Sequence, residues 1–155
     1  MKRITIPKRH ILQHKGDLNT KLYIVESGLL RSYSIDAQGK EHIFMFAPED
    51  WLLTDNHPLG QPAELFIDAL EETTLTAQDK SRVTDFDPIK MVKRMTVLQE
   101  RVIMLMSATA IERYEHFVKT YPQIVQRVPQ KMIASYLGIT PEALSRAKKD
   151  RVLKK

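Results

Sequence analysis

The pattern of the sequence changes at Pro88, and this change most constrains what the chain can fold into. Before Pro88, short segments rich in Tyr, Ile, Val and Phe are broken repeatedly by Gly and Pro, as in KLYIVESG, LLRSYSI and HIFMF. After it, no Gly or Pro occurs until Pro122, and apolar residues recur at helical spacing. We therefore expect β structure first and helices afterwards.

The fold class predicted from this pattern is α+β. Many short strands at regular spacing indicate an antiparallel sandwich or β-roll of the jelly-roll type over about residues 3–86. The segment DAQG, Asp36 to Gly39, predicts a hairpin turn between two of the strands. A long helix should begin at Pro88 with Asp87 as its N-cap, and a C-terminal helical bundle should follow.

Composition excludes several kinds of protein. The chain has 155 residues, 43% of them hydrophobic, which allows one ordinary domain or two small ones, and we expect two small modules. It has no Cys, which excludes disulfides, thiolate-bound iron–sulfur clusters and Cys nucleophiles. No apolar run approaches the roughly 20 residues of a membrane span, and the start, MKRITIPKRH, is no signal peptide. We expect a soluble, cytoplasmic protein with no membrane partner.

Positive charge is concentrated at the C-terminal end. Residues 127–155 carry eight basic and two acidic side chains, a net charge of +6, whereas the whole chain carries +5. The rest of the chain is therefore slightly negative. This asymmetry indicates a module that meets a polyanion. The alternative from charge alone is a solvated basic tail.

The long helix has two apolar stripes. The first, which we call the seam, has heptad spacing and consists of Met91, Met95, Leu98, Val102 and Leu105. A second stripe runs beside it through Ile89, Val92, Ile103 and Met106. Two stripes fit a helix that packs on its own sheet with one face and on a partner helix with the other. The alternative is one wide, core-facing stripe in a monomer.

The stretch IASYLGITPEALSRAKK has the pattern of a helix-turn-helix. We expect a helix over residues 131–137 and a sharp turn at Gly138, where glycine tolerates the required backbone angles. Thr140 should cap the next helix and Pro141 should be its first residue. Leu144 should face back toward the first helix.

If the second helix lies in a DNA major groove, its early exposed positions face base edges. Those positions are Glu142, Ser145 and Arg146. Arg146 can donate two hydrogen bonds to a guanine, Glu142 can accept from a cytosine amino group, and Ser145 can bond either base type. Thr140, Lys148 and Lys149 are candidates for phosphate contacts. In the simpler alternative, Glu142 complements the helix dipole and Arg146 is solvated.

The chain resembles the Crp/Fnr superfamily of bacterial transcription regulators. The resemblance is carried by residues 14–33, HKGDLNTKLYIVESGLLRSY; residues 66–75, FIDALEETTL; residues 107–129, SATAIERYEHFVKTYPQIVQRVP; and residues 133–146, IASYLGITPEALSR. It implies a cyclic-nucleotide-binding-type β-roll over 1–87, a dimerisation helix over 88–108 and a DNA-binding helix-turn-helix domain over 109–155. It also implies a homodimer on a near-palindromic operator, with Glu142, Ser145 and Arg146 reading bases. RNA polymerase and an unidentified small-molecule effector are further candidate partners.

The sequence departs from the cyclic-AMP-binding members of that superfamily. Their phosphate-binding cassette has an Arg that pairs with the phosphate, whereas Ala63 and Glu64 stand in the matching segment here. A carboxylate would repel a cyclic phosphate, so we expect no cyclic-AMP response. The candidate effector pocket consists of Glu49, Trp51, Glu64 and Phe66. The five histidines form no ligand spacing, so we expect no metal and no cofactor.

Two other classes of function compete with this interpretation. A cupin-type enzyme would share the β-roll, but it needs a His-x-His motif with a Glu and a further His, which the sequence lacks. We therefore expect no enzyme and no catalytic residues. The second alternative is a sensor or interaction protein whose helix-turn-helix no longer binds DNA. It is favoured by the small Ala147 and by the lack of residues for a β-hairpin wing after the last helix.

Overall fold

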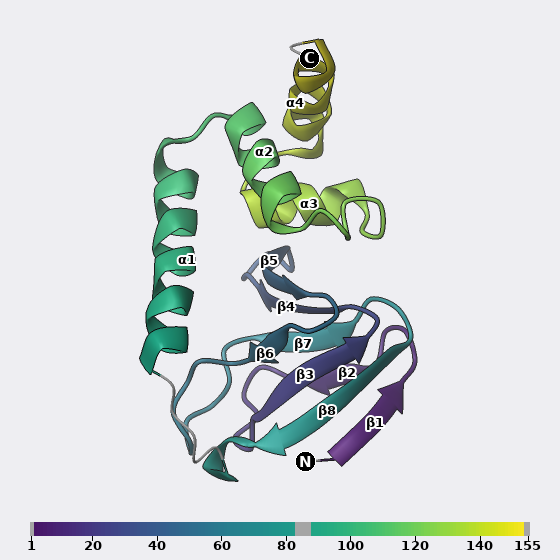
Figure 1. The fold of residues 1–155 in the computed structure, drawn as a ribbon, viewed down its shortest axis with the longest axis vertical. Coiled ribbons are helices and arrows are strands. Elements are labelled where there is room, and N and C mark those ends of the chain that lie inside the picture. Colours follow the sequence, from purple (N-terminus) through teal and green to yellow (C-terminus); the bar gives the residue numbers. More distant parts are fainter. Residues whose placement is uncertain (1, 83–87, 154–155) are drawn as a thin grey trace. The chain divides into compact units, whose positions relative to one another are not determined.

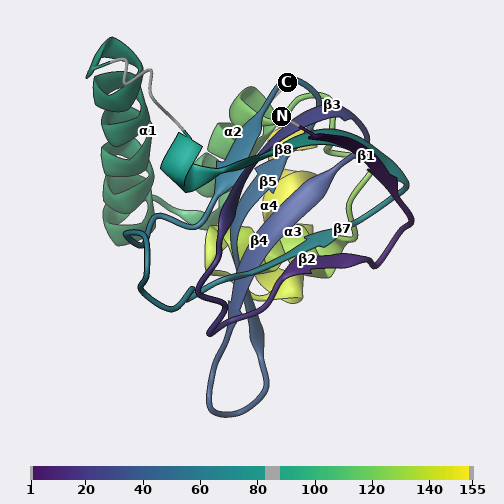
Figure 2. The same cartoon turned by 90° about the horizontal axis from the view of Figure 1, so that it is seen from below.

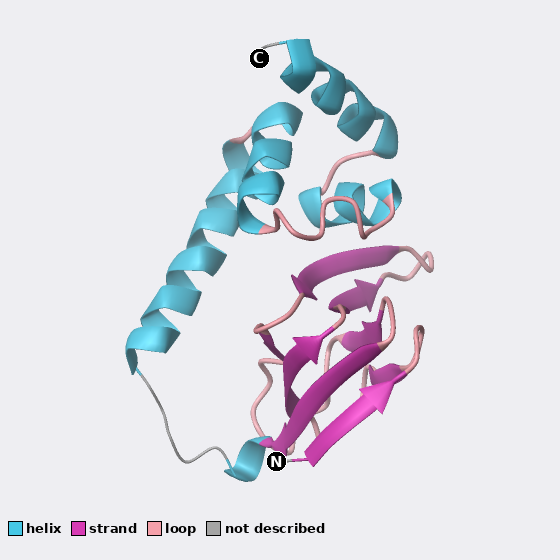
Figure 3. Ribbon diagram, turned by 45° about the vertical axis from the view of Figure 1, so that its right-hand side comes forward, coloured by secondary structure: helices cyan, strands magenta, loops and turns pink. Residues whose placement is uncertain are grey.

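The computed structural model describes residues 2–82 and 88–153. By its internal contacts the chain divides into two compact units, residues 1–84 and 85–155. In the described residues the first unit consists of strands and one short 3-10 turn, and the second consists of helices (Figures 1 and 3). We call them the sheet unit and the helical unit.

The sheet unit consists of two antiparallel sheets. Its strands are β1 (Lys2–Ile6), β2 (Ile11–Gln13), β3 (Lys21–Ser27), β4 (Leu30–Ile35), β5 (Glu41–Ala47), β6 (Leu52–Thr54), β7 (Phe66–Ala69) and β8 (Thr73–Asp79), followed by the turn η1 (Lys80–Arg82). The sheets have the strand orders β1-β8-β3-β6 and β2-β7-β4-β5. Figure 2 shows the two sheets curling around a common interior. The predicted antiparallel β structure is confirmed.

Alternating residues of the strands form the core between the two sheets. Tyr23 and Val25 of β3 are buried there from one sheet, and Leu30 of β4 and Ile67 of β7 are buried from the other. Because the side-chain period of a strand is two, the residues between them point away from this core. In β3 burial alternates accordingly, with Tyr23 and Val25 buried and Leu22 and Ile24 half-buried.

The predicted hairpin turn at residues 36–39 joins β4 to β5. The Gly39 N–H donates to the Asp36 carbonyl oxygen at 3.0 Å, and Gly39 has φ of 78°. The Asp36 side chain accepts from the backbone N–H groups of Gln38 and Lys40. These bonds satisfy the backbone groups of the turn, as expected for Asp at the first turn position. In Figure 2 this hairpin extends away from the rest of its sheet.

A tighter turn at Gly28 joins β3 to β4. Gly28 has φ of 99°, and a Cβ atom added to it would lie 2.5 Å from the Glu72 carbonyl oxygen. The Gly28 N–H donates to Glu49 Oε1 at 3.1 Å, and the next N–H, of Leu29, donates to Thr73 Oγ1 at 3.1 Å. Only glycine combines the left-handed angle with this close approach.

The helical unit contains α1 (Pro88–Ser107), α2 (Ala110–Thr120), α3 (Gln130–Leu137) and α4 (Pro141–Leu153). The predicted start of the long helix at Pro88 is confirmed, while its predicted cap, Asp87, lies outside the described residues. The two residues Ala108 and Thr109 separate α1 from α2. Thr109 and Glu112 form a capping box in which each side chain bonds the backbone N–H of the other. This box ends the run of α1 and starts α2.

Three aromatic side chains form a cluster in the core of the helical unit. Phe117, Tyr121 and Tyr136 are buried, and their three rings contact one another with centroid distances of 5.4 to 5.5 Å. Two of these contacts are tilted or edge-to-face, and the Tyr121–Tyr136 pair is nearly perpendicular, the geometry that ring quadrupoles favour. Burial raises the pKa of the Tyr136 hydroxyl, so it stays protonated over the physiological range. The cluster holds α2 against α3.

Candidate functional site

The turn between α3 and α4 has the geometry expected from its sequence. Gly138 has φ of 64°, a left-handed angle, and its N–H donates to the carbonyl oxygens of Ala134 and Ser135. The Ile139 N–H donates to the Ala134 carbonyl oxygen at 3.0 Å. These bonds satisfy carbonyl groups that the end of α3 would otherwise leave open. The predicted sharp turn at Gly138 is confirmed.

Thr140 caps α4. Its Oγ1 accepts a hydrogen bond from the Ala143 N–H at 3.1 Å, and its carbonyl oxygen accepts from the Leu144 N–H at 3.0 Å. This is the N-cap geometry predicted for Thr140, and Pro141 is the first residue of the helix, as predicted. The cap and the left-handed glycine together fix the direction in which α4 leaves α3.

α4 has one buried side and one exposed side. Leu144 is fully buried, and Ala147, one turn later, is 3% exposed. Glu142, Ser145 and Arg146 are exposed, and their spacing of three and four residues puts them on one helical face. The structure therefore brings the three predicted base-reading residues together. The small Ala147 is part of the packed side of the helix.

The basic residues at the end of α4 differ in their surroundings. Lys148 is half-buried, with its Nζ 5.9 Å from the centroid of the Tyr114 ring, and the guanidinium of Arg151 lies 5.8 Å from the same centroid. Cations over a ring face are held by its quadrupole. Lys149 is exposed. Of the two lysines assigned to phosphates, Lys149 is therefore the more accessible.

The seam of α1 is exposed in part. Met95 and Val102 are 61% and 55% exposed, Leu98 and Leu105 are half-buried, and the side chain of Met91 lies outside the described residues. Leu105 faces the turn after α3, since its Cδ2 would lie 3.5 Å from a Cβ atom at Gly138. The second stripe is also exposed, at Ile89, Val92, Ile103 and Met106. The exposed apolar side chains described on α1 in these two stripes are therefore Met95 and Val102 of the seam and the four residues of the second stripe.

The four residues of the candidate effector pocket have distinct surroundings in the sheet unit. Glu49 accepts from the Gly28 N–H, and Trp51 packs at the margin of the core. Glu64 forms an exposed ion pair with Lys15, with Nζ 3.1 Å from Oε2. Phe66 stacks on Tyr33 with the ring centroids 5.4 Å apart. The pocket thus stays a prediction.

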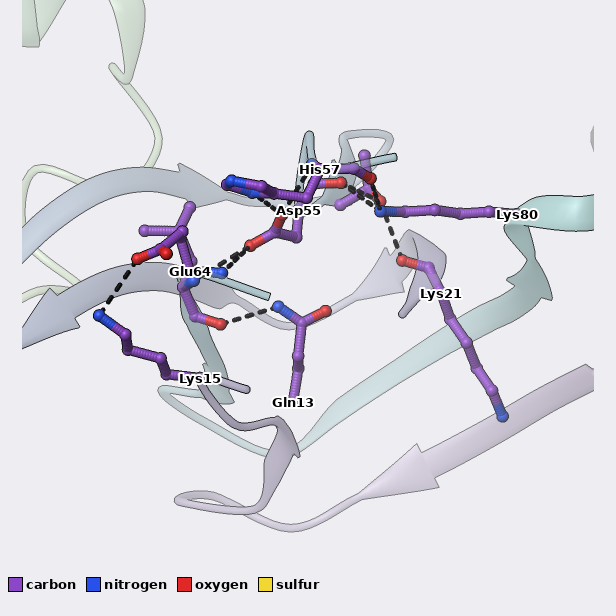
Figure 4. Close-up of polar contacts among 9 residues, drawn as sticks. Gln13, Lys15, Lys21, Asp55, His57, Glu64 and Lys80 are labelled. Atoms are coloured by element: carbon purple, nitrogen blue, oxygen red, sulfur yellow. Dashed lines mark hydrogen bonds and ion pairs between the residues drawn. The ribbon is translucent and has the colours of Figure 1, made fainter. Parts of the chain in front are cut away.

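A buried carboxylate organises the loop between β6 and β7 (Figure 4). The Asp55 side chain is 1% exposed and accepts hydrogen bonds from the backbone N–H groups of His57, Glu64 and Leu65 at 2.8 to 3.0 Å. His57 Nδ1 lies 2.8 Å from Asp55 Oδ1. Lys80 Nζ donates to the carbonyl oxygens of Asp55 and His57. The loop is therefore tied to the end of the last strand.

These hydrogen bonds change the acidity of Asp55. Burial by itself raises the pKa of the Asp55 carboxyl, but the bonds from His57, Leu65 and Glu64 outweigh burial and hold the pKa below its usual value. A carboxyl whose folded pKa is depressed stabilises the fold at all pH values above its unfolded pKa of about 3.9. That stabilisation is lost as the pH falls through the folded pKa.

We expect Asp55→Asn to lower the free energy of unfolding by about 1–3 kcal/mol at neutral pH, because buried donors lose a charged acceptor. The difference from the wild type should shrink as the pH falls below about 4, where the carboxyl of the unfolded chain becomes protonated, and should vanish below the lower folded pKa. Denaturant unfolding over a pH series measures both effects. The matched control is Asp50→Asn, an exposed carboxyl in the same unit. A difference that stays constant to low pH would contradict the assignment.

The histidines are distributed over separate contacts. His14 contacts Phe66 edge-on, His42 Nε2 lies 2.7 Å from Asp36 Oδ2, and His57 pairs with Asp55. Among the residues that the structure describes, no three His, Cys, Asp or Glu side chains gather in a possible metal site. None of the helices in the described ranges is long and apolar enough to cross a membrane.

Comparison with known proteins identifies the family. The family model for the cyclic nucleotide-binding domain matches residues 3–87, more than half of the chain. The chain belongs to this family. The resemblance to the Crp/Fnr superfamily inferred from the sequence is confirmed as well.

The relatives are regulatory proteins. The chain is 27% identical over 163 aligned residues to the anaerobic regulatory protein of Aggregatibacter actinomycetemcomitans and 25% identical over 142 to the nitrogen fixation regulation protein FixK of Rhizobium meliloti (strain 1021). These alignments cover 91% and 85% of the chain but 63% and 66% of the relatives, so the chain spans slightly less than two thirds of their length. The solved structure of FixK2 from Bradyrhizobium japonicum has the same fold, with a TM-score of 0.80 at 19% identity over 99% of this chain and 85% of that one.

In this Crp/Fnr-type chain, Ala63 and Glu64 lie in the loop between β6 and β7 and have defined partners. Ala63 is buried, its N–H donates to the Asp17 carbonyl oxygen at 2.9 Å, and its own carbonyl oxygen accepts from the Gly16 N–H at 2.8 Å. The following residue, Glu64, is paired with Lys15.

Several structural residues were not predicted from the sequence. Asp55 has no local motif, because its donors come from residues up to ten positions away. Arg31 is buried and its Nε and Nη2 donate to Asp68 at 2.8 and 2.9 Å, while Nη1 donates to Glu41 at 2.6 Å. Arg113 lies in the ERY segment that carries the family resemblance, so that motif could have indicated it.

Proposed function

We propose that the chain is a sequence-specific, DNA-binding transcription regulator of the Crp/Fnr type that acts as a homodimer in the bacterial cytoplasm, with α4 as the recognition helix. The observation that carries this proposal is the exposed face of α4. Glu142, Ser145 and Arg146 lie together there, while Leu144 and Ala147 bury the opposite side. A helix held this way presents donors and an acceptor to a major groove.

The two sets of residues have different roles in this proposal. Arg146 donates two hydrogen bonds to a guanine, Glu142 accepts from a cytosine amino group, and Ser145 bonds either base type. Lys149 and Lys148 contact phosphates and supply affinity that depends on salt. Thr140, whose Oγ1 caps α4, is proposed to direct the positive end of that helix toward a phosphate.

Dimerisation is proposed to occur through α1. The exposed Met95 and Val102 of the seam support this proposal, because an apolar stripe with heptad spacing pairs with a second copy of itself. Two recognition helices about 34 Å apart would then meet successive major-groove faces of a near-palindromic site. RNA polymerase is a further proposed partner of the DNA-bound dimer.

The sheet unit is proposed to sense an effector other than cyclic AMP. The ion pair of Glu64 with Lys15 and the buried Ala63 support the lack of a cyclic-AMP response. An effector would act by binding one of two conformations more tightly than the other. The proposed contact residues are Glu49, Trp51, Glu64 and Phe66.

The selection of binding sites from a random DNA pool tests the proposed function. The purified protein is used at about physiological salt, so that non-specific phosphate binding is suppressed. We expect enrichment of a two-fold palindrome. If no motif is enriched with any effector-containing extract, the proposal fails and a sensor with a helix-turn-helix that does not bind DNA becomes the better interpretation.

Substitutions on α4 separate base reading from phosphate binding. Arg146→Ala should weaken binding to the selected site by about 1–3 kcal/mol and relax the preference at one base position. Lys149→Ala should weaken specific and random DNA similarly and reduce the salt slope by about 1. Fluorescence anisotropy with both DNAs at several salt concentrations measures these changes. Equal losses on specific and random DNA for both variants would disprove the assignment of base reading to Arg146.

A further inference from the structure

The side chain of Arg113, in α2, joins the ends of two other helices. Its Nε donates to the Ala108 carbonyl oxygen at 2.9 Å, Nη2 to the Leu105 carbonyl oxygen at 2.8 Å, and Nη1 to the Leu137 carbonyl oxygen at 2.9 Å. Leu105 lies in the last turn of α1, Ala108 directly follows α1, and Leu137 is the last residue of α3. One planar guanidinium therefore binds the C-terminal ends of both helices.

The carbonyl groups that Arg113 binds are suited to a cation. The last carbonyl groups of a helix have no partner within the helix, and they form its negative end. Arg113 is half-buried and forms no ion pair with a carboxylate in the described part of the chain. Its charge is thus balanced by helix ends, and the rigid fork fixes the directions of the three bonds relative to one another.

A second arginine reinforces the same junction. Arg101 of α1 donates from Nη2 to the Tyr136 carbonyl oxygen of α3 at 3.3 Å, and its guanidinium lies 4.0 Å from the centroid of the Tyr136 ring. The last two carbonyl groups of α3 are therefore bound by arginines from two different helices. A rotation of α3 relative to α1 would therefore break hydrogen bonds of both arginines.

The direction of α3 determines the direction of α4. The turn at Gly138 and the Thr140 cap leave little freedom between these two helices. If two chains pair along α1, the separation of their α4 helices therefore depends on the angle between α1 and α3. Each base pair added to DNA moves a half-site by about 3.4 Å and turns it by about 35°. A dimer with a fixed angle accepts one spacing of half-sites.

We propose that Arg113 is a positioning residue that fixes α1 relative to α3 and thereby sets the half-site spacing that the dimer accepts. This inference rests on the proposed function, because it presumes a dimer on a palindromic site. It assigns no base contact to Arg113. In this role Arg113 does more than stabilise the fold, because it also determines which operators the dimer binds.

The first experiment measures spacing preference. The palindrome selected by the wild type is prepared with its central spacer changed by one or two base pairs in each direction, together with a single half-site. We expect the wild type to prefer its own spacer by at least about tenfold over neighbouring spacers, a difference of about 1.4 kcal/mol. In Arg113→Gln this ratio should fall to less than about threefold, while half-site affinity changes by less than about twofold.

Two further variants test whether the spacing preference depends on the charge of Arg113 or on its planar guanidinium. Lys119→Gln, which removes one positive charge from an exposed position of the same helix, should keep the wild-type spacing preference. Arg113→Lys keeps the charge but not the planar fork, and should recover the preference only in part. Full recovery by lysine would overturn the role of the fork. Equal losses on all spacers and on the half-site would reduce Arg113 to a stabilising residue.

The second experiment needs neither DNA nor a dimer. The chain has no cysteine, so Gln99→Cys in α1 and Asp150→Cys in α4 introduce a unique pair of spin labels at exposed positions. Labelled protein is diluted with unlabelled protein so that distances within one chain dominate. We expect a narrow distance distribution that broadens in Arg113→Gln and not in Lys119→Gln. An unchanged width in Arg113→Gln would overturn the inference. If the distribution broadens as expected but the DNA selection yields no palindrome, the proposed DNA-binding function is refuted instead.

Discussion

Gly28→Ala is expected to destabilise the sheet unit by about 2–5 kcal/mol, because two costs add. The first cost is the backbone angle, since φ of 99° lies in the region that side chains disfavour. The second is steric: the new Cβ would lie 2.5 Å from the Glu72 carbonyl oxygen and 2.7 Å from Thr73 Cα. These are backbone atoms and cannot rotate away, so the turn between β3 and β4 must open.

Gly39→Ala is the matched control for this prediction. Gly39 has a similar left-handed angle, with φ of 78°, but no atom lies within 4 Å of an added Cβ. Gly39→Ala should therefore lower the free energy of unfolding by only about 1–2 kcal/mol, the cost of the left-handed backbone angle. Denaturant unfolding followed by circular dichroism measures both variants. Equal destabilisation by the two substitutions would mean that the close approach at Gly28 contributes nothing.

The second large effect is expected for Val102→Glu, which should weaken dimerisation by more than about a hundredfold. A paired helix would bury two unpaired carboxylates at this position, and each costs several kcal/mol. The single chain should fold normally, because Val102 is 55% exposed within it. Sedimentation equilibrium over a range of concentrations measures the change, and circular dichroism checks that the helix content is kept.

Val97→Glu provides the matched control, because it introduces the same side chain on the same helix. Val97 is 52% exposed and lies outside both apolar stripes, so the added charge should leave the dimer intact. Unchanged association of Val102→Glu would exclude α1 as the dimer interface. A wild-type protein that stays monomeric at all concentrations would remove the proposed homodimer itself.

The elements that could be predicted were those with local causes. Four features each depend on residues within five positions of one another: the hairpin turn at Asp36, the start of α1 at Pro88, the left-handed turn at Gly138 and the cap at Thr140. Backbone preference and short-range hydrogen bonds decide such features, so the sequence displays them directly. The exposed face of Glu142, Ser145 and Arg146 followed from the same helical periodicity.

By itself the sequence therefore determined the order of strands and helices, the helix-turn-helix pattern and the resemblance to a family. Only the tertiary structure decided which polar groups meet across the chain. Asp55 binds the N–H groups of Glu64 and Leu65, and Arg113 binds Leu137, twenty-four residues away. The reason is physical: a buried charge accepts any correctly placed backbone group as its partner, so no particular residue type marks the contact in the sequence.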